Sequence, residues 1–251
     1  AMTVANDGNV YFSGTMDGIL YRYLPETKQV QQVAQSAEDR FVWDIQAAAD
    51  GTIVSATYPR CKVFAYDTRT HEFSDLGSMS AKEQYARSAA VTADAVYTGI
   101  GSTIQLMRFD RQTGAKQELF MDGYTGEKGF VDRIWVMGDL LFLSVNRSEI
   151  VVYDEHARQV VDQIAGAEAI VSDEQEQAKY YLVKSAGLWT YDSASKALSK
   201  LLDLPNCSLT TKIKLMQRVT LSNEEWKAIA DRANFKTKAA ASRGSGDRRA
   251  V

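Results

Sequence analysis

One segment of about 43 residues returns five times along the chain, and this repeat constrains the fold more than any single motif does. Each copy ends its third predicted strand with an aromatic residue followed by a turn. The positions after the aromatic residue are separated by 43, 43, 44 and 38 residues. A fixed period of this size indicates a repeat architecture. The aligned pairs are Tyr23-Leu24, Tyr66-Asp67, Phe109-Asp110, Tyr153-Asp154 and Tyr191-Asp192.

The second copy shows the repeated unit most clearly. Its pattern predicts strands over 41–49, 52–58 and 62–66, followed by a more polar outer strand over 71–76. Asp50-Gly51 forms the first turn because these residues tolerate a positive φ, and Asp67 caps the turn after the third strand. A period of 40–45 residues is typical of four-stranded propeller blades. A β-sandwich, by contrast, has no reason to repeat one turn signature five times. We therefore predict an all-β fold, a β-propeller of about five four-stranded blades.

The last 47 residues differ from the repeats in charge. They contain ten Lys and Arg against four Asp and Glu, a net charge of +6 that leaves −9 on the other 204 residues. A basic segment of this kind is an arm for an anionic partner, a segment that docks on its own acidic body, or a segment that is simply solvated. We assign residues 1–204 to the propeller and 205–251 to a basic C-terminal tail.

Within the tail, Leu209–Leu221 alternates apolar and polar residues as a strand does. Ser222-Asn223-Glu224-Glu225 is a capping box that predicts a helix over 223–233. The composition of 239–251 is typical of disorder. Strand followed by helix faintly resembles half of a ribbon-helix-helix DNA binder, but no second amphipathic helix follows, so nucleic acid is not an expected partner. The strand is our candidate to cover a sheet edge left open by the short first strand near Met2.

No run of 18 apolar residues occurs, so no transmembrane helix is expected. The sequence does not begin with a charged segment followed by an apolar one, as a leader peptide does. Ala1-Met2 is typical of a cloning remnant, so this start is compatible with a leader that this sequence does not include. Cys61 and Cys207 either pair in an oxidising compartment or are buried thiols.

The repeats resemble a known class of proteins. Asp7-Gly8-Asn9-Val10-Tyr11-Phe12, Gly18-Ile19-Leu20-Tyr21-Arg22-Tyr23 and Lys62-Val63-Phe64-Ala65-Tyr66-Asp67 are similar to bacterial β-propeller repeats of the broad YVTN, NHL and PQQ-like class. This resemblance covers about 7–203 and implies a secreted or periplasmic protein that binds sugars, proteins or cofactors, with lyase activity in some members. The tryptophan-docking motif of PQQ enzymes is not visible, so we expect no cofactor.

Motifs for catalysis or metal binding are not found. The sequence lacks the histidine-glutamate zinc motif, paired Cys-x-x-Cys, the nucleophile elbow and the phosphate-binding loop. Gly99-Ile100-Gly101 is interpreted as a pair of glycines between strands. His71 and His156 follow the Asp-capped turns, on the face opposite the usual ligand site, and are predicted to be solvated turn residues. We predict no metal site and assign no catalytic residue.

Aligning the copies does give one candidate site at the channel mouth, where first strands begin and the loops after second strands emerge. Charges are costly at such crowded inner positions unless they are paired or bind a ligand. They form either a ring of ion pairs that closes the channel or a polar pocket for a ligand. The candidate ligand-binding residues are Trp43, Asp44, Tyr58, Arg60, Tyr85, Arg87, Asp132 and Arg133, with Asn146, Arg147, Glu168 and Lys184 nearby.

Two functions fit this site. The first is a non-catalytic module outside the cytoplasm that binds a carbohydrate or a protein at the mouth. The alternative is a lyase or hydrolase for an acidic polysaccharide, in which Tyr58 or Tyr85 is the base and Arg60, Arg87 or Arg133 neutralises the uronate. The absence of a histidine at the predicted mouth favours the binding module.

Overall fold

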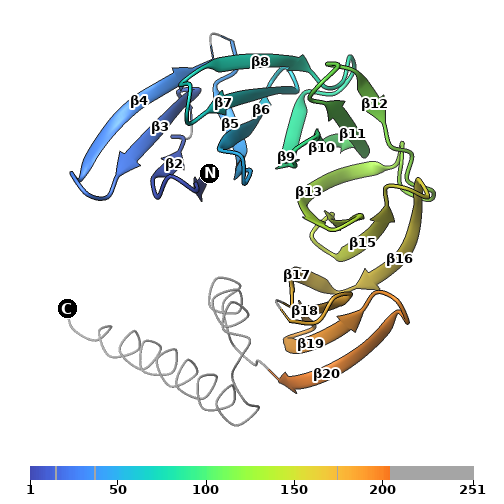
Figure 1. Cartoon of the computed structure of the whole chain (residues 1–251). Coiled ribbons are helices and arrows are strands. Elements are labelled where there is room, and N and C mark those ends of the chain that lie inside the picture. The colour runs from blue at the N-terminus through green and yellow to red at the C-terminus, as the bar shows by residue number, and fades with distance from the viewer. Residues whose placement is uncertain (15, 37, 174, 204–251) are drawn as a thin grey trace, which may run out of the picture. The chain divides into compact units, whose positions relative to one another are not determined.

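The computed structural model describes residues 1–203 apart from Thr15, Ala37 and Glu174 (Figure 1), and this part of the chain consists of strands without a helix. The strands are β1 (Met2–Val4), β2 (Val10–Phe12), β3 (Ile19–Leu24), β4 (Gln29–Gln35), β5 (Phe41–Ala47), β6 (Thr52–Tyr58), β7 (Lys62–Asp67), β8 (Phe73–Ser78), β9 (Tyr85–Val91), β10 (Ala95–Thr103), β11 (Gln105–Asp110), β12 (Lys116–Glu118), β13 (Lys128–Met137), β14 (Leu140–Val145), β15 (Glu149–Asp154), β16 (Gln159–Ala165), β17 (Ala167–Ser172), β18 (Lys179–Lys184), β19 (Gly187–Asp192) and β20 (Ala197–Asp203).

Consecutive strands are hydrogen-bonded in groups of four, which we call modules 1 to 5 in chain order. Modules 1, 2 and 5 are separate four-stranded antiparallel sheets. Modules 3 and 4 share one sheet because the end of β10 pairs with the start of β13, with Gly101 opposite Phe130. For the described residues, the prediction of an all-β fold built from four-stranded antiparallel sheets, as in a propeller-like fold, is confirmed.

The chain divides into two units. Unit 1 contains residues 1–147 and 151–163, and unit 2 contains residues 148–150 and those from 164 onward. Within unit 1, Figure 1 shows β5, β9 and β13 innermost and β4, β8 and β12 on the outside. β9 contacts both β5 and β13, and β1 contacts β5. Successive sheets of unit 1 therefore meet along their first strands.

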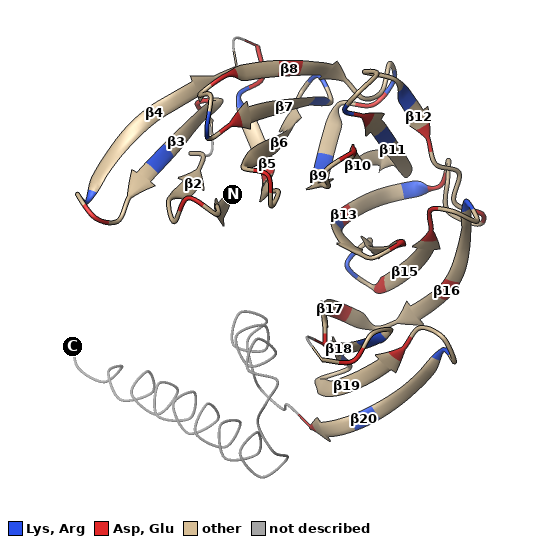
Figure 2. Ribbon diagram, in the orientation of Figure 1, with Lys and Arg blue, Asp and Glu red and all other residues tan. Residues whose placement is uncertain are grey.

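The core of unit 1 lies between neighbouring modules. One apolar cluster joins modules 1 and 2 through Tyr11 and Ile53, a second joins modules 2 and 3 through Val63 and Ile100, and a third joins modules 3 and 4. Figure 2 shows that β6 and β10, which face these clusters, carry no charged residue. Burial of both sheet faces explains why these two second strands contain only apolar, glycine and hydroxyl-bearing residues, as expected for sheets covered on each side.

The same turn follows the third strand of each copy. Asp67, Asp110, Asp154 and Asp192 each accept a hydrogen bond from the backbone N–H three residues on, as the repeat predicted. The turn ends in a residue with a φ between 53° and 73°. These residues are Lys28, His71, Gly114, Arg158 and Lys196.

Four strand boundaries of module 2 differ from the prediction. β7 ends at Asp67 rather than Tyr66, and β8 ends at Ser78 rather than Leu76. β5 ends at Ala47 because Ala48 already bonds across the turn to Thr52, and β8 begins at Phe73 because His71 has the left-handed φ of the turn. His71 nevertheless makes a specific contact, since its Nδ1 lies 2.9 Å from the Tyr66 hydroxyl.

The interpretation of Gly99-Ile100-Gly101 as a segment between strands is wrong, because all three residues lie inside β10. Here glycine permits close packing. A Cβ on Gly99 would lie 2.3 Å from Ser88 Oγ and 2.7 Å from the Val131 side chain, and one on Gly101 would lie 2.1 Å from the Phe130 ring. The missing side chains let β13 approach β10 and β9.

We predict that Gly99→Ala destabilises unit 1. The added methyl group meets buried atoms on two strands, and overpacking of this kind costs about 1–3 kcal/mol in the free energy of unfolding. Urea denaturation of the full chain measures this cost. Ser102→Ala on the same strand, at an exposed position, is the control and should change the value by less than about 0.5 kcal/mol. An unchanged stability of Gly99→Ala would contradict the close approach.

Unit 2 contains module 5, whose sheet order is β17-β18-β19-β20. Its buried residues include Leu182, Leu188 and Tyr191. Trp189 donates its indole N–H to the Lys184 carbonyl, and the ammonium groups of Lys184 and Lys200 lie about 6 Å from its ring centroid. Lys184 also donates to the Ala165 carbonyl, so this predicted mouth residue is held within its own unit.

Several predictions fall outside the described residues. These are the strand over 209–221, the helix over 223–233, the disordered end and the pairing of Cys207. Cys61 is fully buried, and burial raises the pKa of its thiol to about 12. In the part of the chain that the structure describes, no helix is long and apolar enough to cross a membrane.

Candidate functional site

A β-bulge recurs at one place in the first strand of four modules. The pairing of β5 with β6 steps from Val42 to Asp44, so Trp43 has no partner across the ladder. Arg87 in β9 and Asp132 in β13 are passed over in the same way, and so is Glu168 in β17 of unit 2. A bulge redirects a side chain and bends its strand. In unit 1 the bulge places the extra residues of β5, β9 and β13 at the same height along these adjacent strands.

The three bulge residues of unit 1 contact one another in series. The Arg87 guanidinium carbon lies 4.5 Å from the centroid of the Trp43 ring, within the range of a cation–π interaction. On its other side Arg87 donates from Nε to Asp132 Oδ1 at 3.2 Å, and Arg147 Nε donates to the same oxygen at 3.2 Å. The two contacts of Arg87 join module 2 to module 3 and module 3 to module 4, whereas Arg147 and Asp132 both belong to module 4.

Aromatic residues stand two positions before each of these bulges. Phe41 precedes Trp43, Tyr85 precedes Arg87, and Phe130 precedes Asp132. Tyr85 contacts the Phe130 ring edge-on at a centroid distance of 5.7 Å and lies 6.2 Å from the Trp43 ring. A cavity of about 380 Å³ opens among these groups. We call its lining the platform, which consists of Trp43, Tyr85, Arg87, Phe130, Asp132, Asn146 and Arg147.

Two hydrogen bonds beneath the platform join the first strands. Asp44 Oδ2 accepts from the Ala89 backbone N–H at 3.1 Å, and Ser88 donates to the Val131 carbonyl at 2.7 Å. These partners are 45 and 43 residues apart, one repeat in each case. Burial raises the pKa of Asp44, against the opposing effects of the Ala89 N–H and the positive charge of Arg133.

We predict a pH signature for Asp44. Because its folded pKa is raised, the folded chain keeps a proton that the unfolded chain has already released above a pH of about 4. The free energy of unfolding therefore falls as pH rises through this interval. In Asp44→Asn the titration is absent, so the stability of the wild type minus that of the variant should decrease from pH 4 upward, as measured by urea denaturation.

Asp110→Asn is the control of opposite sign. Hydrogen bonds from the Thr113 N–H and Arg108 lower the pKa of Asp110 to about 2. The contribution of Asp110 to the free energy of unfolding is therefore lost as pH falls below about 4. A stability difference for Asp44→Asn that stays constant or grows with pH would contradict the raised pKa.

The structure places the eight predicted site residues in three groups. Trp43, Tyr85, Arg87 and Asp132 line the platform. Tyr58 stacks on Tyr85 at 4.5 Å, and Asp44 lies beneath as described above. The remaining two do not line the platform. Arg60 pairs with Glu38 at 2.5 Å, and the exposed Arg133 lies 5.9 Å from the Trp135 ring while its charge acts on Asp44.

Sequence reasoning missed Phe41 and Phe130. A signal was present, because an aromatic residue stands two positions before the bulge in three copies. Gly166 stands at the corresponding position before Glu168, so the pattern ends with module 4.

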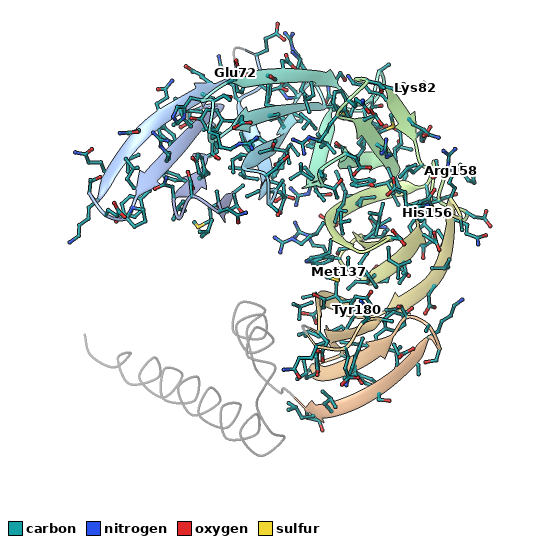
Figure 3. All side chains as sticks on the ribbon, viewed as in Figure 1. Glu72, Lys82, Met137, His156, Arg158 and Tyr180 are labelled. Atoms are coloured by element: carbon teal, nitrogen blue, oxygen red, sulfur yellow. The ribbon has the colours of Figure 1, made fainter. Side chains whose placement is uncertain are left out.

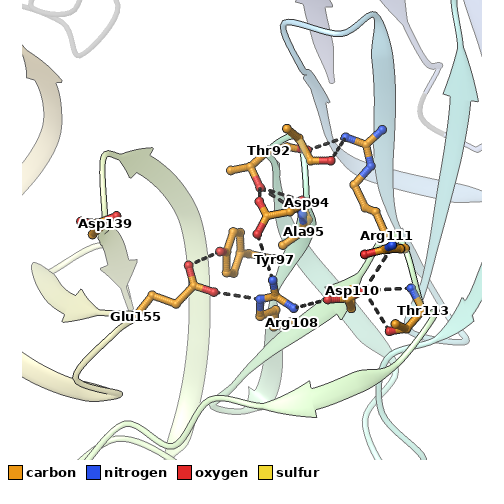
Figure 4. A network of polar contacts seen from close by, with 12 residues as sticks. Thr92, Asp94, Ala95, Tyr97, Arg108, Asp110, Arg111, Thr113, Asp139 and Glu155 are labelled. Carbon is orange, nitrogen blue, oxygen red and sulfur yellow. Dashed lines mark hydrogen bonds and ion pairs between the residues drawn. The ribbon is translucent and has the colours of Figure 1, made fainter.

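A second polar cluster, which the sequence did not reveal, surrounds Arg108 (Figure 4). Arg108 forms ion pairs with Glu155 at 2.8 Å, Asp110 at 3.0 Å and Asp94 at 3.1 Å, and Tyr97 donates its hydroxyl to Glu155. Together these interactions hold the pKa of Arg108 above its ordinary value, although burial acts in the opposite direction. The cluster faces a cleft of about 650 Å³ between modules 3 and 4.

The turn between β15 and β16 also borders this cleft, and Figure 3 labels His156 and Arg158 on it. His156 Nε2 lies 3.4 Å from Asp139, and the side chains of both residues are largely exposed. His156 is therefore a solvated turn residue that does not line the platform.

We predict that Arg108→Ala is strongly destabilising. Removing the guanidinium leaves three carboxylates facing one another, and breaking a buried ion pair costs about 3–5 kcal/mol; partial solvent screening reduces this here to about 2–3 kcal/mol. The control is Arg69→Ala, since the Arg69–Asp67 pair is exposed to solvent that screens its charges, so its loss should hardly shift the midpoint. Thermal denaturation of both variants would contradict the prediction if their midpoints shifted equally.

Comparison with known proteins supports the architecture. No protein-family profile matches the chain, and no curated protein is similar in sequence. Among solved structures 1289 chains match. One is a β-propeller-like chain from the crystal structure of the mitotic checkpoint complex, with a TM-score of 0.62 and 12% sequence identity. The match covers 78% of this chain and 62% of that one. A likeness at this identity shows the fold alone, because propellers carry many unrelated functions.

Proposed function

We propose that the protein is a β-propeller interaction module that binds another protein through the platform. The observation that carries the proposal is the series of contacts from Trp43 through Arg87 to Asp132, made by the equivalent bulge residues of three modules. Trp, Tyr and Arg are the residues most enriched among those that dominate binding energy in protein interfaces. The platform contains all three types around one cavity.

The exposure of these groups also fits an interface. Trp43 is 39% exposed, whereas the Arg87 side chain is 17% and the Asp132 side chain 12% exposed. The tryptophan offers a wide apolar surface, and the charged groups beside it are already oriented by their mutual contacts. Little side-chain freedom is then lost on binding, which favours affinity.

We do not propose the lyase. A general base works best with a pKa near the working pH, and burial raises the pKa of Tyr85 above its ordinary value of about 10. His71 and His156, which would be better bases, do not line the platform. The test described below can also identify a carbohydrate ligand.

We further propose that residues 1–204 form a propeller of five blades, with modules 1 to 5 as the blades and residues 205–251 as a separate tail. The recurrence of one turn and one bulge supports the equivalence of the modules. The resemblance of the repeats to bacterial propeller proteins supports a location outside the cytoplasm.

The test begins with peptides selected from a random display library on the full chain. We predict that Trp43→Ala weakens these peptides by about 2 kcal/mol or more, equivalent to about 30-fold in Kd, because truncating a central aromatic anchor has this cost. Fluorescence anisotropy measures the Kd. Phe73→Ala is the matched control, since Phe73 is an aromatic residue of β8 that is 40% exposed and outside the platform.

Equal weakening by both variants, or selection of no peptide that depends on Trp43, would overturn the proposal. A glycan array in which neutral or uronate oligosaccharides bind the wild type and not Trp43→Ala would instead identify a carbohydrate-binding module.

A further inference from the structure

We infer that the partner presents a carboxylate side chain next to an apolar one, and that Arg147 is the specificity residue that binds the carboxylate. This inference rests on the proposed function and names the chemistry of its ligand. It comes from the charge and geometry of the platform rather than from its aromatic content alone.

The platform holds more positive than negative charge. Arg87 and Arg147 both donate to the same oxygen of Asp132, so two guanidinium groups share one carboxylate and leave a net charge of +1. Among the residues that the structure describes, no other carboxylate forms an ion pair with either arginine. Both hydrogen bonds come from Nε and do not use the terminal nitrogens, through which Arg147 can bind a ligand.

Exposure distinguishes the two arginines. The Arg87 side chain is 17% exposed and lies against the Trp43 ring, whereas the Arg147 side chain is 71% exposed. A guanidinium binds a carboxylate through two parallel N–H donors, and Arg147 can present such a pair to solvent. Arg147 is therefore the group that an incoming carboxylate reaches.

The backbone that carries Arg147 is fixed in place. Asn146 and Arg147 form the turn after β14 with φ values of 52° and 55°. Asn146 Oδ1 accepts from the Phe130 N–H at 2.9 Å, which fastens this turn to β13. A Cβ on Gly129 would lie 2.1 Å from Asn146 Oδ1, so glycine is needed there for the contact. The charged group is thus pre-oriented beside the aromatic rings.

The same cavity supplies the apolar half of the site. Tyr85 and Phe130 meet edge to face, and Trp43 is half exposed next to them. A volume of about 380 Å³ lies at the small end of the range for ligand pockets and suits a few side chains rather than a large polymer. Nucleic acid would need many phosphate contacts, which one excess positive charge does not provide.

Composition of the selected peptides tests the inference. Library selections are run in parallel on the wild-type chain, Trp43→Ala, Arg147→Glu and Arg69→Glu. We expect the Trp43-dependent peptides of the wild type to be enriched in Asp or Glu next to an aromatic or aliphatic residue. Such a peptide should bind Arg147→Glu about tenfold or more weakly, and the pool selected on this variant should shift to Lys and Arg.

Arg69→Glu makes the same charge change at a side chain that is 66% exposed and lies outside the platform, so its pool should keep the acidic enrichment. Arg147→Met removes the charge without reversing it and should lose the acidic preference without gaining a basic one. Thermal midpoints close to that of the wild type establish that the variants are folded.

The outcomes separate the two proposals. Peptides that need Trp43 but show no acidic enrichment, or whose Kd is unchanged by Arg147→Glu, overturn the inference and leave the interaction module standing. A selection without any Trp43-dependent peptide overturns the module and the inference with it.

Discussion

The approach of one first strand to the next is the constraint on which unit 1 depends. β5, β9 and β13 are neighbours that do not pair as a sheet, so their facing polar groups need other partners. Asp44 supplies an acceptor for the Ala89 N–H, and Ser88 supplies a donor for the Val131 carbonyl. Glycine at position 99 leaves the space that this approach requires. Side-chain hydrogen bonds thus join first strands that do not pair with one another, and between modules 3 and 4 they act beside the short β10–β13 ladder.

The same strands produce the platform. A bulge next to these bonds turns Trp43, Arg87 and Asp132 out of the ladder, and the short distance between strands brings the three into contact. The platform therefore results from the same strand bulge repeated in adjacent modules. The position of the platform depends on buried groups such as Asp44, whereas the chemistry of the platform depends on the exposed ends of its side chains.

The sequence predicted the repeat, the capped turns and most of the platform, because these features recur at a fixed interval. It could not predict that Arg60 turns to Glu38, since both are loop neighbours whose pairing has no periodic signal. The Arg108 cluster was missed for the same reason, as its acidic partners come from different elements of two modules. Gly99 was misassigned because glycine weakens a strand pattern, although here the strand needs it.

A comparison of the two arginine clusters supports the platform, rather than the Arg108 cluster, as the proposed binding site. Arg108 faces three carboxylates and its charge is more than balanced, so a ligand anion would meet repulsion there. At the platform two arginines share one carboxylate, and the more exposed of them has terminal nitrogens to offer. A network that is satisfied internally stabilises the fold, whereas a network with an excess donor gains further from a partner that supplies the acceptor. This difference in balance, rather than the size of the cavities, favours the platform, since the cleft beside Arg108 is the larger.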